Sequence, residues 1–224
     1  MRGTLAAVIA AGACASVAHA GTFALVGVNF DTGTLWNINT ATAGTSSPRA
    51  TGFAGYTGIA ADGAGLLYAT TTFGAPIPNA LVTIDALTGD TNVVGSLGLN
   101  ANFEGDLAFD PGTGSLYGLQ DAQSLTPELY RIDPNTGSAF LIGPVATAAT
   151  GDLSAMAFVN DDLLAIDTQN DQLLTLNRFT GAVLGAIALS EPIGSLAGMR
   201  VDRATGDVSV ADGEQGGADA GNLY

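Results

Sequence analysis

Carboxylates are the side chains of this chain whose type and position could support chemistry. Glu104, Asp106 and Asp152 each precede a short apolar run, so we expect them at strand starts, where groups from neighbouring strands can converge. A pair of carboxyl groups can act as acid and base or nucleophile in glycoside hydrolysis. Carboxylate oxygens also suit a hard cation such as Ca²⁺. Together with Asp167, these residues are the candidate metal ligands, and the sequence indicates no required cofactor.

A second group of polar side chains lies in four segments of differing length and composition, which we expect to be loops. Variable loops on a rigid framework are common places for recognition. Their carboxylates and amides suit the hydroxyls of a carbohydrate or the polar groups of a protein partner. The candidates for a ligand-binding face are Asp121, Gln123, Gln169, Asn170, Asp171, Asp212 and Glu214. No spacing pairs these residues specifically, so a solvated acidic rim is the alternative.

The first 20 residues have the pattern of a secretory signal. Arg2 supplies a positive start, residues 4–13 an apolar stretch, and Ala18-His19-Ala20 a small-x-small cleavage site. We therefore expect export to the periplasm or the extracellular space, a mature chain from Gly21, and few contacts between residues 1–20 and the folded domain. The stretch is too short for a transmembrane helix, which needs about 20 residues. A lipid-modified Cys14 is the alternative, although no leucine stands three residues before it.

Removing this segment excludes several kinds of chemistry. Cys14 and His19 are the only cysteine and histidine, and the chain has no lysine. The mature chain then has no disulfide, no thiolate nucleophile, no Ser-His-Asp triad and no zinc or copper site of the usual ligands. Its 5 basic and 21 acidic residues give a net charge of −16, which opposes binding to nucleic acid.

A turn that recurs along the chain indicates the framework. It appears as Asp85–Gly89, Asp133–Gly137 and Asn177–Gly181, with a divergent copy at Asn39–Ala43, and the copies begin 46, 48 and 44 residues apart. This period matches a four-stranded propeller blade of about 40 to 50 residues. A second turn recurs between apolar runs, at Asp110 for example. Because Asp caps turn amides and Gly adopts positive φ, we predict a structural role for these aspartates rather than calcium loops.

Short apolar runs between the turns predict an all-β chain of antiparallel, four-stranded blades, with strands a to d from the axis outwards. Strand c carries a recurring pair, which we expect at equivalent positions in successive blades: Leu35-Trp36, Leu81-Val82, Leu129-Tyr130, Leu173-Leu174 and Leu223-Tyr224. After the signal segment 1–20, residues 21–224 divide into blades of about 22–52, 53–99, 100–147, 148–191 and 192–224, the last incomplete.

The strand order within these blades suggests a truncated chain. The first recognisable strand is of type b and the last is of type c, so we expect blade one to lack strand a and blade five to lack strand d. About 4.5 blades would then be present. The total number of blades stays open between five and seven.

Three segments of the third blade carry a resemblance to a known class. Phe109-Asp-Pro-Gly-Thr-Gly-Ser-Leu-Tyr117, the run 128–137 and Leu141-Ile-Gly143 resemble blades of bacterial exported propeller-repeat proteins, of the YVTN/NHL/PQQ-like class. Many such proteins end in a PEP-CTERM-type sorting tail. The resemblance extends over nearly all of residues 21–224 and implies a fold and a compartment rather than an activity. The sequence shows no sorting tail, so cell-surface association stays open. The tryptophan-docking motifs of quinoprotein blades are not seen either, so quinone binding does not carry over.

Two functional hypotheses follow from these observations. The favoured one is an exported, non-catalytic propeller that binds a protein or carbohydrate ligand, and the alternative is a carboxylate-dependent carbohydrate-active enzyme. Two carboxyl groups converging at about 5 to 10 Å would favour the enzyme. Acids dispersed in solvent would favour the binding scaffold. The sequence specifies neither the ligand nor an oligomeric state.

Overall fold

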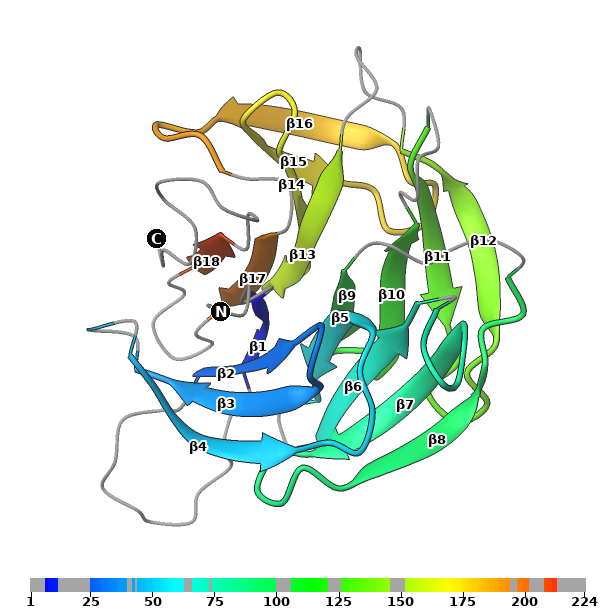
Figure 1. The fold of residues 1–224 in the computed structure, drawn as a ribbon. Coiled ribbons are helices and arrows are strands. Elements are labelled where there is room, and N and C mark those ends of the chain that lie inside the picture. The colour runs from blue at the N-terminus through cyan, green and yellow to red at the C-terminus, as the bar shows by residue number, and fades with distance from the viewer. Residues whose placement is uncertain are drawn as a thin grey trace.

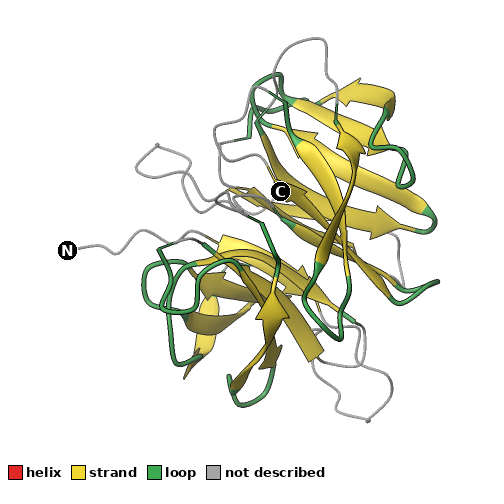
Figure 2. Cartoon of the chain, turned by 90° about the vertical axis from the view of Figure 1, so that its right-hand side faces the viewer, coloured by secondary structure: helices red, strands yellow, loops and turns green. Residues whose placement is uncertain are grey.

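The structure is a computed structural model in which every regular element of the described residues is a strand (Figure 2). It describes residues 7–11, 25–39, 42, 44–62, 66–72, 74–99, 106–120, 126–145, 152–193, 197–201 and 208–212. These residues form four four-stranded sheets and one two-stranded sheet, all with antiparallel pairing between neighbours. The predicted all-β propeller of four-stranded antiparallel blades is confirmed.

The sheets follow one another in chain order. The first contains β1 (Ala7–Ala11), β2 (Leu25–Asn29), β3 (Thr34–Ile38) and β4 (Thr45–Ala50). The second contains β5 (Tyr56–Ala61), β6 (Leu66–Thr71), β7 (Ala80–Asp85) and β8 (Thr91–Ser96). The third contains β9 (Leu107–Asp110), β10 (Ser115–Gln120), β11 (Glu128–Ile132) and β12 (Ala139–Pro144). The fourth contains β13 (Leu153–Val159), β14 (Asp162–Asp167), β15 (Gln172–Leu176) and β16 (Val183–Ala188). The two-stranded sheet contains β17 (Ala197–Val201) and β18 (Val208–Asp212).

The blades are arranged around a common axis (Figure 1). Their innermost strands neighbour one another in the order β1, β5, β9, β13 and β17, and β17 lies beside β1 again. The described inner strands thus form a closed ring of five. Such closure removes the open sheet ends that a flat array of blades would expose.

The recurring strand c pairs of the first four blades occupy equivalent positions, as predicted, whereas Leu223-Tyr224 lies outside the described residues. The second member of each pair lies opposite a residue of the neighbouring strand b: Gly27 opposite Trp36, Ala69 opposite Val82, Gly118 opposite Tyr130 and Ala165 opposite Leu174. The pairs also supply the cores between blades. Leu35 of blade one and Val82 of blade two belong to one buried cluster, and Leu129 of blade three and Leu174 of blade four to another. Burial of facing apolar surfaces therefore holds the blades together.

The recurring turns also join the blades. In each complete copy the glycine has positive φ and its N–H donates to the carbonyl of the first turn residue, at 2.8 Å for Gly89, Gly137 and Gly181. A β-carbon on Gly137 would lie 2.6 Å from the carbonyl oxygen of Gly95, in strand d of the preceding blade. Glycine is required there for two reasons, the left-handed backbone and the close approach of the next blade.

The structure corrects two expectations about the N-terminus. Residues 7–11 were expected to have few contacts, and blade one was expected to lack strand a, but β1 pairs along its whole length with β2 and forms the inner strand of blade one. The reason is that a short, uncharged apolar run suits a buried inner strand as well as the apolar part of a signal. Cleavage after Ala20 stays a prediction.

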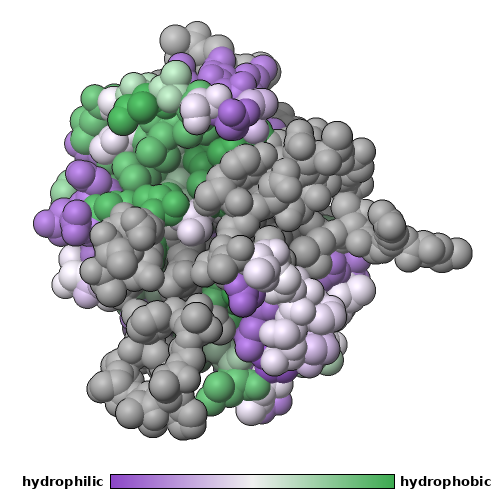
Figure 3. All heavy atoms as spheres, turned by 90° about the vertical axis from the view of Figure 1, so that its left-hand side faces the viewer, coloured by the Kyte–Doolittle hydropathy of each residue, from purple (hydrophilic) through white to green (hydrophobic). Residues whose placement is uncertain are grey.

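The outermost strands differ in polarity between blades. Leu184 and Ile187 of β16 are 65% and 67% exposed. Apolar side chains gather accordingly in the upper part of the face shown in Figure 3, where blade four lies. β4 instead carries Thr, Ser, Pro and Arg residues, which are mostly exposed. Within the described residues, no helix is long and apolar enough to cross a membrane.

Candidate functional site

The candidate face is formed where strand b ends and strand a begins. In blade four these two ends meet through the Thr168 N–H and hydroxyl, which both donate to the carbonyl of Asp152 at 2.9 Å. In blade three the Leu119 N–H donates to the carbonyl of Asp106 at 3.1 Å. In blades three and four, the end of strand b, where the b–c loop begins, therefore lies beside the start of the inner strand.

Asp106 lies at the centre of this end and is 1% exposed. Its Oδ1 accepts the N–H groups of Leu107 at 2.8 Å and Ile59 at 3.3 Å. Its Oδ2 accepts the N–H of Met156 at 3.0 Å, and the N–H of Met199 donates to the same carboxyl group. One carboxyl group thus binds the inner strands of blades two, three, four and five at the axis.

The repeat explains how these donors converge. Ile59, Leu107, Met156 and Met199 occupy the same register position, opposite Ala69, Gly118, Ala165 and Val210 in their strands b. The residue before each donor is Gly58, Asp106, Ala155 and Gly198. Blades two, four and five therefore have glycine or alanine at this level, and blade three fills the space with the carboxyl group of Asp106. This pattern is the signal in the sequence that could have identified Asp106 as an axial residue.

The environment of Asp106 changes its proton affinity. Burial raises its pKa to about 8, and the four backbone N–H donors offset part of that effect. Burial disfavours the charged carboxylate because water is excluded, whereas N–H donors favour it. Asp106 can therefore hold a proton near neutral pH, but its oxygens are already engaged by the main chain.

Asp167 is the second buried carboxylate of the candidate face, also 1% exposed. Its Oδ1 accepts the N–H groups of Gln169 at 3.2 Å and Asn170 at 3.1 Å, and its Oδ2 accepts the side-chain amide of Asn170 at 2.8 Å. Asp171 follows with a φ of 50° and accepts the Ile193 N–H at 3.3 Å. These carboxylates shape the b–c loop of blade four and leave the exposed Gln169 and Asn170 at its tip.

The remaining candidates are divided between exposed and undescribed positions. Asp152 is exposed immediately before β13, and it makes a further interaction besides its contact with Thr168. Asp212 is the last residue of β18, and only its backbone is described. Glu104, Asp121, Gln123 and Glu214 lie outside the described residues. Among the described residues, no three His, Cys, Asp or Glu side chains are grouped as a metal site.

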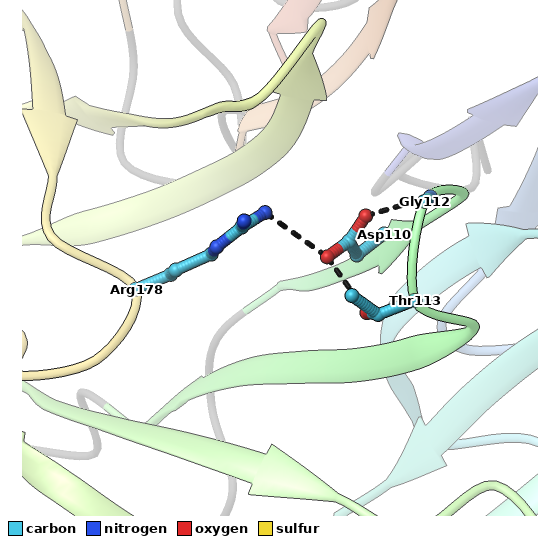
Figure 4. Close-up of polar contacts among 4 residues, drawn as sticks. All are labelled: Asp110, Gly112, Thr113 and Arg178. Carbon is cyan, nitrogen blue, oxygen red and sulfur yellow. Dashed lines mark hydrogen bonds and ion pairs between the residues drawn. The ribbon is translucent and has the colours of Figure 1, made fainter.

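A further buried carboxylate lies at the opposite end of β9. Asp110 was predicted to cap a turn, and it does: its Oδ1 accepts the Gly112 N–H at 2.8 Å and its Oδ2 the Thr113 hydroxyl at 2.7 Å. Oδ2 also accepts Arg178 Nη1 at 3.1 Å (Figure 4). Arg178 lies in the c–d turn of blade four, so this ion pair joins two blades. Turn motifs gave no indication of it, because the two residues belong to different repeats.

Comparisons with known proteins support the fold. The glutaminyl cyclase of Myxococcus xanthus superposes with a TM-score of 0.62 at 15% identity, covering 93% of this chain and 84% of that one. A chain of the nidogen/laminin complex gives a TM-score of 0.53 at 10% identity, covering 82% and 80%. A Bacteroides thetaiotaomicron protein of unknown function gives 0.54 at 14% identity, covering 87% and 51%. Neither a protein-family model nor a curated protein sequence matches the chain. At these identities the likeness concerns the fold alone.

Proposed function

We propose that this chain is an exported, non-catalytic β-propeller scaffold that binds its ligand on the face of the b–c loops and strand a starts. The observation that carries this proposal is that Asp106 and Asp167 have a structural role. Both are buried, and both are engaged by N–H groups of the fold itself. The strongest carboxylate candidates in the described part of the face therefore stabilise the fold, and this favours a structural role over a catalytic one.

The exposed groups in the described part of this face are polar. Gln169 and Asn170 lie at the tip of the b–c loop of blade four, and Asp152 lies close by, immediately before strand a of the same blade. Amides and carboxylates of this kind bind sugar hydroxyls or polar groups of a protein surface. The strong negative charge opposes nucleic acid and anionic surfaces. A carbohydrate or protein ligand is accordingly the class we propose, with Ca²⁺ as the candidate cation.

One observation favours the alternative of a carboxylate-dependent carbohydrate-active enzyme. The raised pKa of Asp106 is a property that a general acid needs at neutral pH. However, a general acid must come within hydrogen-bonding distance of the glycosidic oxygen, and Asp106 is 1% exposed and bonded to four inner strands. Its burial therefore favours the binding scaffold.

A pair of matched variants tests the location of binding. Asp152→Asn removes a charge from the candidate face, and Asp161→Asn removes one from the exposed a–b turn at the other end of blade four. Full-length protein is screened against immobilised glycans and candidate protein ligands, and Ca²⁺ is titrated by calorimetry. We expect any binding to weaken in Asp152→Asn and to persist in Asp161→Asn. Loss in Asp161→Asn alone would place the site on the opposite face.

Two further measurements address catalysis and export. Incubation with aryl glycosides of several sugars should release no chromophore above the uncatalysed rate, and release abolished by Asp152→Asn would support the enzyme instead. N-terminal sequencing of exported protein should begin at Gly21. A start at lipid-modified Cys14 would replace the signal-peptide interpretation with the lipoprotein one.

A further inference from the structure

The innermost strand of blade one comes from the segment that the sequence predicts to be removed. β1 lies within residues 1–20, pairs with β2 at five positions from Ala7 opposite Asn29 to Ala11 opposite Leu25, and lies beside β5 and β17. Residues 12–24 connect it to β2. If export removes residues 1–20, the ring of inner strands loses one member.

The consequence for β2 follows from its burial. All five residues from Leu25 to Asn29 are buried, and β3 pairs with the four from Leu25 to Val28 on the other side. Without β1, the main-chain N–H and C=O groups along the inner edge of β2 lose their partners. Buried backbone groups without partners are costly, so such an edge favours pairing with another extended chain.

The register shows which backbone groups are involved. In blades two, three and four, the N–H groups of Ile59, Leu107 and Met156 point to Asp106 rather than to strand b. Ile9 occupies the equivalent position in β1, because it lies opposite Gly27. Since hydrogen-bonded and non-hydrogen-bonded pairs alternate in antiparallel sheets, Val8 and Ala10 form the pairs that bond β1 to β2.

Charge also favours the pairing of an uncharged segment with β2. The only charged side chain in residues 1–20 is Arg2, whereas the remainder has a net charge of −16. An uncharged or weakly basic segment therefore approaches the domain without the repulsion that a second acidic chain would meet. This argues for a peptide of the kind present in β1 rather than for a strand of another copy.

We propose that the inner edge of β2 is a strand-acceptor site in the mature protein, filled by an extended, uncharged peptide of small and β-branched residues that lies antiparallel to β2. Residues 7–11 show the binding mode. This inference depends on cleavage after Ala20, but it concerns the ring and not the ligand face. Recognition would be by main-chain pairing, as in other cases of strand addition.

The test uses the full-length chain with a specific protease site between Ala20 and Gly21, cleaved after folding. The released segment is exchanged against a labelled synthetic peptide of residues 4–13. We expect saturable binding and a melting temperature that rises with peptide concentration. A peptide with Ala10→Pro should bind at least about tenfold more weakly, because proline removes an N–H of the ladder. The uncleaved chain, whose site is filled, should bind no peptide.

Cross-linking tests the register in the uncleaved chain. In a Cys14→Ser background, Val8→Cys with Val28→Cys should form a disulfide, because directly opposite residues lie within disulfide distance. Ala10→Cys with Val28→Cys, displaced by two positions, is the matched control and should form far less.

Two results would overturn the inference. One is a cleaved chain that keeps its melting temperature after the segment has been removed and binds no labelled peptide. The other is equal cross-linking of the two cysteine pairs. Neither result would affect the comparison of Asp152→Asn with Asp161→Asn, so failure of this inference is distinct from failure of the proposed function.

Discussion

The two ends of β9 carry buried aspartates that are stabilised in opposite ways. Asp106 precedes the strand at the axis and is held by main-chain N–H groups of four blades, whereas Asp110 ends the strand and pairs with Arg178 of the next blade. Each is 1% exposed. Burial alone therefore does not identify a reactive carboxylate. What distinguishes the two is the charge of the partners, neutral donors at one end and a guanidinium at the other.

This difference has an electrostatic consequence at the axis. Neutral donors compensate less for lost water than a cation does, and burial raises the pKa of Asp106 to about 8. The folded protein then keeps a proton at this site over a pH range in which the unfolded chain has released it. Stability from Asp106 is therefore full below its unfolded pKa of about 3.8 and is lost as pH rises towards 8.

The largest effect is expected at the axis. Asp106→Ala leaves four backbone N–H groups without an acceptor among the inner strands. At about 1 kcal/mol or more for each buried unpaired donor, the free energy of unfolding should fall by roughly 4 kcal/mol or more. Guanidinium denaturation followed by circular dichroism measures it. A loss below about 1 kcal/mol would mean that water or other groups replace the carboxyl group, and would refute its role.

Asp110→Ala should have the next largest effect. It removes a buried carboxylate that binds Gly112, Thr113 and Arg178, and the guanidinium remains partly buried without its partner. We expect a loss of about 2 to 4 kcal/mol, since breaking one side of a buried pair is costly. Asp161→Ala, at an exposed turn of blade four, is the control and should unfold almost as the wild type does. Equal losses would show that turn composition, not burial, determines the effect.

Arg178→Met should be milder. The side chain is 23% exposed, and its guanidinium lies 5.1 Å and 6.0 Å from the ring centres of Phe179 and Phe158. Methionine retains much of the apolar contact, so we expect a loss of about 1 to 2 kcal/mol. In a double-mutant cycle with Asp110→Ala the two losses should be clearly less than additive. Additive losses would mean that the two residues stabilise the blades independently.

The smallest effect is expected for Asp133→Ala, in the exposed c–d turn of blade three. Asp133 accepts the N–H of Asn135 and the hydroxyl of Thr136, which lowers its pKa. Water can replace the carboxylate at an exposed turn, so the melting temperature should fall, but less than for Asp110→Ala. A larger fall in melting temperature than that of Asp110→Ala would contradict the account, because it would show that the exposed cap stabilises the fold more than the buried one does.

These contrasts show which features of the fold and of the candidate site can be predicted from the sequence. The equivalence of Leu81-Val82 with Leu129-Tyr130 and the capping roles of Asp85, Asp110 and Asp133 follow from local spacing, and the structure confirms them. Local spacing does not predict which residues of different blades contact one another. Two of the four donors to Asp106 come from residues 47 and 50 positions away, and Arg178 lies 68 positions from Asp110.

The N-terminal strand was missed for another physical reason. The run of Ala, Val and Ile in residues 7–11 has the apolarity of a signal segment and of a buried inner strand alike, and composition does not separate the two. Pairing with β2 identifies residues 7–11 as a strand, and this pairing is visible only in the three-dimensional structure.

The most direct test of the account is the pH dependence of unfolding for the wild type and Asp106→Asn, measured by chemical denaturation between pH 4 and pH 8. Asparagine keeps the shape but does not titrate, so other ionisable groups cancel in the difference. With a folded pKa of about 8, the wild type should lose several kcal/mol relative to the variant as pH rises across this range, at about 1.4 kcal/mol for each pH unit. Parallel curves would contradict the account, because they would show that Asp106 has the same proton affinity in the folded and unfolded chains.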